Sequence, residues 1–340
     1  MKSVITLSFL LLTLWSFQYT IPHNSNIPDH FPVPKSKRIS NLDSHTVELG
    51  RVLFFDTQFS ADHLVSCASC HSPYHSFAHT DHRLSHGAFD SIGRRNAPAL
   101  FNLAWQEIFM HDGAAHNLQA QSLAPLTSAT EMATTLDHVK TILNTDILYL
   151  DLFQEAFANE PTIPKALEAL EAFQLSLISA ESKYDRVQNG IEKFTDQELQ
   201  GFEVFIENCA NCHPPPLFST YGFAVNGLPI DSNLIDLGRY EQTRNDGDSM
   251  QFKIPSIRNL RYTYPYMHDG RFNSLRQVLD HYSPRNGIMD KSPLTAPIAE
   301  DDKSDLIAFL KTLNDPNFIF NPNHQFPKWT LTNNAIQNEN

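Results

Sequence analysis

Glycine and runs of basic residues are both scarce in this sequence. Only 12 of the 340 residues are glycine, about half the usual share of ~7%, which argues against turn-dense all-β folds and glycine-rich nucleotide-binding loops. Acidic residues outnumber basic ones by 38 to 25, and the formal net charge is −13. Because no stretch is rich in Lys or Arg, the chain lacks the electrostatic footprint of a nucleic-acid-binding protein. The composition favours a helical protein with no nucleic-acid partner.

Cysteine is scarce as well, and all four cysteines fall into two copies of one pattern. Residues 67–71 (CASCH) and 209–213 (CANCH) both have the form C-x-x-C-H. This is the attachment motif of c-type haem, in which two thiols bond to the porphyrin and the adjacent His ligates the iron. A Cys₄ zinc site gives no reason for the two His residues. The sequence therefore predicts two covalently bound haem c groups, held by Cys67, Cys70, His71, Cys209, Cys212 and His213.

The first 20 residues have the composition of an export signal. A single charge at Lys2 precedes an apolar stretch from Val4 to Trp15, and polar residues follow. That length is typical of the apolar region of a signal peptide and short for a membrane span. No clear small-residue cleavage site follows, so an uncleaved N-terminal anchor is the alternative. Both interpretations predict an exported, periplasmic protein.

The chain contains an internal repeat. The segments 98–113 and 255–270 share the pattern Pro-xxx-Asn-Leu followed by MHDG, with thirteen positions from Pro to His in each copy. Each copy follows one haem motif, which predicts a duplicated haem domain. The polar segment 184–194 lies between the copies. We therefore expect an N-terminal haem domain over residues 21–190 and a C-terminal haem domain over residues 191–340; the family resemblance given below implies a peroxidatic role for the first and an electron-transfer role for the second.

Helical periodicity is clearest in three segments. Residues 164–181 begin with a proline and carry apolar residues on one side, and Thr195 to Glu198 form a capping box that opens a helix through Ile206. A third helix is expected around residues 306–313. Strand signals are weak. The expected fold class is all-α, with two haem domains, long loops and little β structure.

The two C-x-x-C-H motifs, the run GRRNAP at 93–98 and the two MHDG elements give the chain a specific family resemblance. Over roughly residues 40–315 it resembles the bacterial di-haem cytochrome c peroxidases and the related MauG proteins. The resemblance implies two cytochrome-c-like domains with the active region at their interface. The first haem reacts with hydrogen peroxide, and the second receives electrons from a small donor such as cytochrome c or a cupredoxin. A homodimer is a further expectation.

The same resemblance assigns catalytic roles near the first haem. His71 and His213 match the proximal iron ligands, Glu131 matches the distal acid–base carboxylate, and Gln121 matches a second pocket residue. A positioned carboxylate helps to cleave the peroxide O–O bond because it moves a proton from one oxygen to the other. Taken alone, Glu131 and Gln121 would also fit solvent-facing helix residues, and both interpretations are open at this stage.

Two further sets of metal ligands follow from the resemblance. The family's calcium ligands match the Asn96 side chain and the carbonyl oxygens of Thr263 and Pro265, and oxygen ligands suit this hard cation. Asn96 would alternatively cap a turn. The displaceable distal His of the first haem matches His86 best, although the loop around it aligns poorly and a surface histidine is the alternative.

The sequence departs from the typical peroxidase pattern at two positions. Tyr282 stands where the resemblance places, in most family members, a Met ligand of the second haem. The MauG proteins also have Tyr at this position, and a phenolate ligand lowers a haem potential. An ordinary core tyrosine is the alternative. His111 replaces the usual Trp between the haems, with Trp105 six residues earlier. Beside a peroxidase, we therefore keep two alternatives: a MauG-like enzyme that oxidises side chains of a partner protein, and a non-catalytic di-haem electron carrier.

Overall fold

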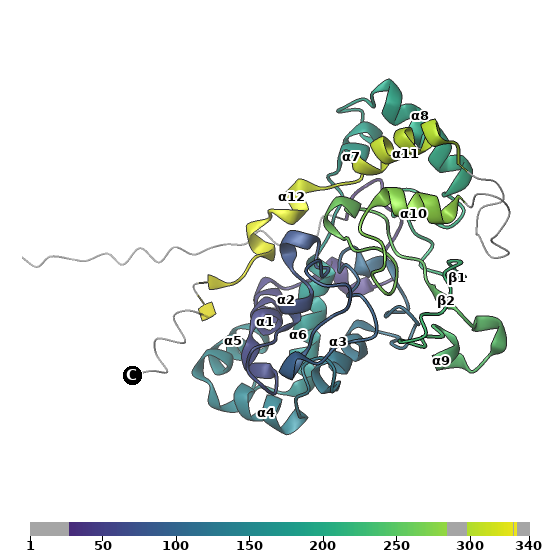
Figure 1. The fold of residues 1–340 in the computed structure, drawn as a ribbon. Helices are drawn as coiled ribbons and strands as arrows, with labels where there is room; N and C mark the ends of the chain where they lie inside the picture. Colours follow the sequence, from purple (N-terminus) through teal and green to yellow (C-terminus); the bar gives the residue numbers. More distant parts are fainter. Residues whose placement is uncertain (1–26, 284–297, 329, 332–340) are drawn as a thin grey trace, which may run out of the picture.

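The computed structural model describes residues 27–283, 298–328 and 330–331. The described chain is mostly helical, with long connecting loops and one small sheet (Figure 1). The all-α expectation is confirmed at that level. Export and anchoring depend on residues 1–20, which lie outside the described residues. No helix in the described ranges combines the length and the apolar character that a membrane crossing requires.

The helices and strands follow one another with long loops between them. The first half contains α1 Ser44–Phe55, α2 Cys67–Cys70, α3 Leu118–Thr127, α4 Leu136–Thr145, α5 Ile147–Phe157, α6 Ile163–Ser176 and α7 Lys183–Gln188. The second half contains α8 Asp196–Asn208, β1 Phe223–Val225, α9 Tyr240–Thr243, β2 Gln251–Lys253, α10 Leu275–Tyr282, α11 Glu300–Lys311 and α12 Pro316–Ile319. Strands β1 and β2 pair antiparallel, with Ala224 opposite Phe252.

The three helices expected from periodicity are present as α6, α8 and α11. The capping box at Thr195 is confirmed, because its hydroxyl accepts from the Glu198 amide and the Glu198 carboxylate accepts from the Thr195 amide. Helix α6 ends at Ser176, five residues before the predicted end at residue 181. The chain leaves the helix there because the Ser179 amide donates to the Asn102 side chain instead of continuing the helical ladder.

Each half is built on one close helix crossing. Helix α1 crosses α6, and an added methyl group at Gly50 would overlap the backbone carbonyl of Ala169. Helix α8 crosses α11, and a methyl group at Gly201 would overlap the carbonyl of Asp305. Only glycine allows helix backbones to approach this closely. The duplication seen in the motifs therefore extends to the helix pair that supports each motif.

Two separate hydrophobic clusters surround these crossings. The first gathers residues of α1 and α3 to α6 around Phe54 and Phe173, and includes Phe77 after the first haem motif. The second gathers residues of α8 and α11 around Phe205 and Phe309, and includes Phe218 after the second motif. Each cluster thus lies against one C-x-x-C-H segment. The domain boundary at residue 190 stays a prediction.

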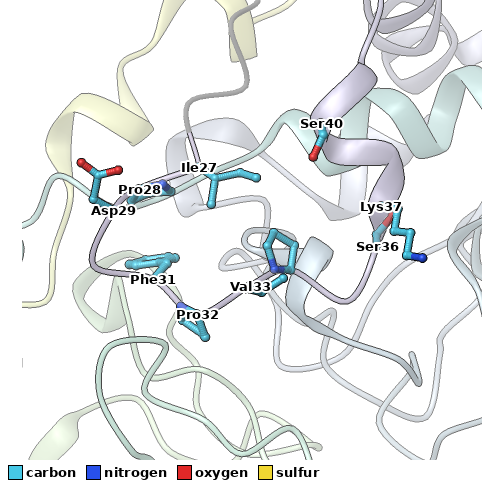
Figure 2. A pocket seen from close by; sticks show the side chains of 10 residues that line it. Ile27, Pro28, Asp29, Phe31, Pro32, Val33, Ser36, Lys37 and Ser40 are labelled. Atoms are coloured by element: carbon cyan, nitrogen blue, oxygen red, sulfur yellow. The ribbon is translucent and has the colours of Figure 1, made fainter.

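A strap formed by residues 27–36 crosses the surface and covers a buried aromatic pair. Phe31 packs edge-on against Trp105 at 5.1 Å between ring centres, and the Trp105 indole N–H donates to the Pro32 carbonyl at 2.7 Å. An open pocket along the strap is lined mainly by proline and apolar side chains (Figure 2). None of the predicted site residues lines it. Trp105 is therefore held in the core by the strap.

Candidate functional site

The first C-x-x-C-H motif occupies a single helical turn, α2. Ser66 precedes the turn and Ser69 closes a capping box with it, because the Ser66 amide donates to the Ser69 hydroxyl at 3.0 Å. Burial raises the pKa of the Cys67 thiol to about 12 and that of Cys70 to about 11. The thiols thus sit in an apolar environment, as the attachment of a porphyrin edge requires.

His71 has the geometry of a metal-binding histidine. Its Nδ1 lies 2.7 Å from the carbonyl oxygen of Phe77. A carbonyl only accepts hydrogen bonds, so Nδ1 carries the proton and Nε2 keeps its lone pair. Burial lowers the pKa of His71 to about 4, and the backbone oxygens of Phe77 and Pro98 oppose that shift. The imidazole is therefore neutral, which is the form that binds iron.

The second motif repeats this arrangement. His213 Nδ1 donates to the Phe218 carbonyl at 3.2 Å, and burial lowers the pKa of His213, with the Phe218 and Pro255 backbone oxygens opposing the shift. Phe77 and Phe218 are both fully buried and both have a positive φ, of 58° and 55°. A left-handed conformation costs a non-glycine residue ~1–2 kcal/mol. It is retained here where it aims a carbonyl at the histidine.

The two prolines that begin the internal repeat each lie beside a haem-motif histidine: the backbone of Pro98 interacts with His71, and that of Pro255 with His213. Together, the thiol pair, the oriented neutral imidazole and the apolar walls fit a covalently bound haem c in each half.

Glu131 lies in the turn between α3 and α4 and is half-buried. Its negative charge raises the pKa of both Cys67 and Cys70, which places the carboxylate near the first motif. Burial in turn raises the pKa of Glu131 itself. The carboxylate is therefore not on an exposed helix start, and it lies near the first motif. Its catalytic role stays a prediction.

Gln121 points its side-chain oxygen into the protein. On α3, its Oε1 is fully buried and has no hydrogen-bond partner among the described residues. Buried amide oxygens are almost always paired, so an unpaired one indicates a group that is held in the complete protein. This orientation argues against the solvent-facing interpretation of Gln121. Its pocket role stays a prediction.

The loop that carries His86 is fastened to the Glu131 turn. The Ala88 amide donates to the Glu131 carbonyl at 2.6 Å, and Gly87 packs against the carbonyl oxygens of Thr130 and Glu131. The His86 ring stacks on His82 at 4.3 Å, and its Nδ1 lies 2.8 Å from an Asp90 carboxylate oxygen. In this structure the side chain thus pairs with Asp90. Iron ligation by His86 stays a prediction.

Tyr282 is the last residue of α10. Burial raises the pKa of Tyr282, and the charges of the Cys209 and Cys212 thiols raise it further. This interaction locates the phenol next to the second haem motif, as its proposed position opposite His213 requires. Whether the phenol ligates iron stays a prediction.

Asn96, the predicted side-chain ligand of calcium, is buried at the seam between the halves, the region where His111 of the first half and His268 of the second both contact its backbone. Its amide nitrogen donates to the Arg83 carbonyl at 3.2 Å, and its backbone carbonyl accepts from His111 Nε2 at 3.0 Å. No cluster of three or more His, Cys, Asp or Glu side chains within the described ranges is arranged for a metal ion. The predicted ligands are amide and carbonyl oxygens of Asn96, Thr263 and Pro265, so the calcium site stays a prediction.

Both MHDG histidines lie where the two halves meet, His268 buried and His111 half-buried. Burial lowers the pKa of His111 and of His268 to about 4, so both imidazoles are neutral. His268 stacks on Phe252 with 3.7 Å between ring centres and 13° between the planes. His111 is thus a fixed, uncharged group in the position where related sequences have Trp.

The MHDG aspartates are bound by arginines that sequence reasoning missed. Arg95 lies 2.8 Å from the Asp112 carboxylate and forms a two-point bond with Asp236, at 2.6 and 2.8 Å. Arg83 reaches Asp269 from the other half of the chain, at 2.7 Å to its carbonyl and 3.1 Å to its carboxylate. Arg95 belongs to the run GRRNAP, which does not reveal its partners, and Arg83 lies outside that run.

Comparison with known proteins gives consistent matches. A family model described as di-haem cytochrome c peroxidase matches residues 44–193. The methylamine utilization protein MauG of Methylorubrum extorquens is 36% identical over 84% of this chain and 82% of its own length. The cytochrome c551 peroxidase of Nitrosomonas europaea is 30% identical over 84% of this chain and 86% of its own length.

Solved structures match over most of the chain. A MauG-like protein associated with microbial copper homeostasis superposes with a TM-score of 0.79 at 25% identity, over 89% of this chain and 98% of that one. The diheme peroxidase BthA from Burkholderia thailandensis superposes with a TM-score of 0.70 at 23% identity, over 84% of this chain and 90% of that one. The BthA match supports the fold alone.

Proposed function

This chain belongs to the di-haem cytochrome c peroxidase family, and from that membership and the site we propose that it reduces hydrogen peroxide to water with electrons from a small redox protein. The balanced reaction takes one peroxide, two protons and two electrons to two waters. The observation that carries the proposal is the asymmetry between two equivalent haem sites. Both sites have an oriented neutral histidine. A carboxylate, Glu131, raises the pKa of the thiols of the first motif, whereas no carboxylate raises the pKa of Cys209 in the second.

A haem held by Cys67, Cys70 and His71 would supply the iron at which peroxide is reduced. Glu131 would accept a proton from one peroxide oxygen and return it to the oxygen that departs as water. The raised pKa of Glu131 suits this role because the carboxyl group must both take up and release a proton. The Gln121 Oε1, which is buried and has no partner within the described residues, would accept a hydrogen bond from the peroxide.

A haem held by Cys209, Cys212 and His213 would take up the electrons from the donor. A small electron-transfer protein, cytochrome c or a cupredoxin, is the proposed donor, and the net charge of −13 suits a cationic one. We also propose that the chain acts in the periplasm, that calcium joins Asn96 to the carbonyls of Thr263 and Pro265, and that the protein forms a homodimer.

A second candidate is the oxidation of side chains in a partner protein. Two observations favour it: Tyr282 lies beside the second haem motif, and the first relative named above is MauG. His111 argues against it, since an uncharged imidazole with a buried N–H bond to Asn96 is a poor stepping stone for an electron hole compared with Trp.

Peroxide consumption by the purified holoprotein distinguishes these functions. A peroxidase consumes peroxide in proportion to reduced cytochrome c or cupredoxin supplied, at two donor electrons per peroxide. Consumption without donor that modifies a co-purified protein supports side-chain oxidation instead. Two haems whose optical spectra do not respond to peroxide indicate an electron carrier and overturn the proposal.

A further inference from the structure

Lys253 is a partly buried lysine where the two halves of the chain meet. It ends β2 of the second half, and its backbone N–H donates to the His111 carbonyl of the first half at 2.7 Å. Its Nζ donates to the Ile108 carbonyl at 2.6 Å and to the Gln106 side chain. Within the described ranges no carboxylate forms an ion pair with it, and burial lowers the pKa of Lys253 to about 7.

Tyr221 is a second buried donor beside Lys253. The Lys253 Nζ lies 5.9 Å from the centre of the Tyr221 ring. The Tyr221 hydroxyl is fully buried and has no hydrogen-bond partner in the described part of the chain. Tyr221 follows His213 by eight positions, so it belongs to the loop that orients the second proximal histidine.

Lys253 Nζ has one unused N–H donor and the neighbouring Tyr221 hydroxyl has no partner among the described residues, so both call for an acceptor. An ammonium group is rarely buried unless an anion pairs with it, and a buried phenol normally donates a hydrogen bond. Lys253 keeps three N–H donors, of which two reach neutral oxygens, so a third is available to an anion. A single carboxylate, with two oxygens, can accept from both Lys253 and Tyr221.

We propose that Lys253 and Tyr221 form the binding site for a propionate carboxylate of one of the two haems. Each haem c is fixed through its vinyl edge by the C-x-x-C cysteines, which leaves the propionate edge to be neutralised by other groups of the chain. Lys253 belongs to the second half, and the Ile108 carbonyl that holds its Nζ belongs to the first. The ammonium group is therefore fixed in place between the two halves, where a propionate can reach it. Lys253 acts as a positioning residue that sets the potential of that haem and joins it to the His111 segment.

This inference rests on the chain carrying haem c and not on the peroxidase activity. It is tested by potentials and vibrational bands measured without peroxide. A chain that failed to reduce peroxide would therefore still test it.

The experiment compares the wild-type holoprotein with Lys253→Met, Lys253→Arg, Tyr221→Phe and an exposed control, Lys140→Met on α4. Optical redox titration resolves the two haems. Loss of the cation leaves the propionate charge uncompensated and disfavours the reduced haem. Lys253→Met should therefore make one haem about tenfold harder to reduce at a fixed ambient potential, which is 59 mV for one electron. Lys253→Arg should retain the potential, and Lys140→Met should leave both haems unchanged.

Resonance Raman spectra of the propionate-bending bands give the independent measurement. Tyr221→Phe should shift one such band, because it removes a hydrogen bond to that carboxylate. A reduction equilibrium constant within twofold of wild type in Lys253→Met, or unmoved propionate bands in Tyr221→Phe, would overturn the proposal. If Lys253→Met yields no holoprotein, the Tyr221→Phe bands decide the question in the same way.

Discussion

Asn102 and Asn259 occupy equivalent positions of the two repeats, and both bind Ser179. Asn102 accepts from the Ser179 amide at 2.9 Å and donates to its carbonyl at 3.0 Å, while Asn259 donates to its hydroxyl at 3.0 Å. Both asparagines are buried, and both have a positive φ, of 53° and 61°. Ser179 therefore joins the two copies of the internal repeat through hydrogen bonds to both asparagines.

We expect Asn102→Ala and Asn259→Ala each to lower the free energy of unfolding by roughly 2–4 kcal/mol. The estimate combines ~1–2 kcal/mol for alanine at positive φ with about 1 kcal/mol for each lost hydrogen bond. Urea unfolding of the holoprotein measures it, and Asn144→Ala on the exposed face of α4 is the control. A loss below about 1 kcal/mol in both variants would show that the serine junction contributes little to stability.

Replacing Glu131 with Gln should slow peroxide turnover by ~10²-fold or more, the range for a lost acid–base group. Both haems should remain attached, as haem staining of denatured protein will show. Glu160→Gln, on an exposed loop, should retain the wild-type rate. The acid limb of the wild-type pH–rate profile should lie above the ordinary range of a glutamate, because burial raises the pKa of Glu131. An unchanged rate in Glu131→Gln contradicts the assignment.

Asp185 and Arg258 should give the protein an acid-sensitive component of stability. Burial alone raises the pKa of Asp185, but the two-point bond from Arg258, at 2.7 and 2.8 Å, outweighs it and lowers the pKa to about 2. A carboxylate with a lowered folded-state pKa stabilises the fold above its ordinary value, and that stabilisation disappears as the pH falls from about 4 to about 2.

Asp185→Asn therefore tests this pair. It leaves Arg258 buried without its anion, so we expect a loss of roughly 3–5 kcal/mol at neutral pH. The pH dependence of unfolding between about 4 and 2 should flatten in the variant. Asp137→Asn, an exposed carboxylate in the first turn of α4, is the comparison. An equal acid limb in Asp185→Asn and wild type would refute the assignment.

Replacing Tyr282 with Phe should change the optical and electron paramagnetic spectra of the second haem and leave those of the first unchanged. The reason is that the phenol lies beside Cys209 and Cys212, where an oxygen ligand or a close hydrogen bond perturbs the iron. Tyr240→Phe on α9 is the control. Identical spectra would return Tyr282 to the role of an ordinary core residue.

Gly50→Ala and Gly201→Ala should each destabilise the half to which they belong. The added methyl group overlaps a backbone carbonyl that no rotamer change can move, and overpacking of this kind costs ~1–3 kcal/mol or more. Thermal unfolding measures the effect when the absorption of each of the two haems is followed separately as the temperature rises. Gly247→Ala, whose methyl group would make only ordinary contacts, should behave as wild type.

The features predicted from sequence are those encoded within a few consecutive residues. The C-x-x-C-H motifs, the capping box at Thr195 and the repeat could all be identified because their spacing is local. The left-handed φ of Phe77 could not, because phenylalanine has no preference for it and only the histidine six positions earlier explains it. The contact of Arg83 with Asp269 joins residues 186 positions apart, and no local pattern records it.

The arginine contacts of the two MHDG elements bear on attempts to obtain a one-haem fragment of this protein. Arg83 belongs to the first haem segment but binds Asp269 of the second, and Arg95 holds Asp112 and Asp236 at once. A gene divided between the two motifs would thus leave the buried Asp236 of the second piece without Arg95, while Asp112 would keep Arg95 and Asp269 would keep Arg271. Co-expression of both pieces, and not excision of either, is the route by which such a minimal cytochrome would be obtained.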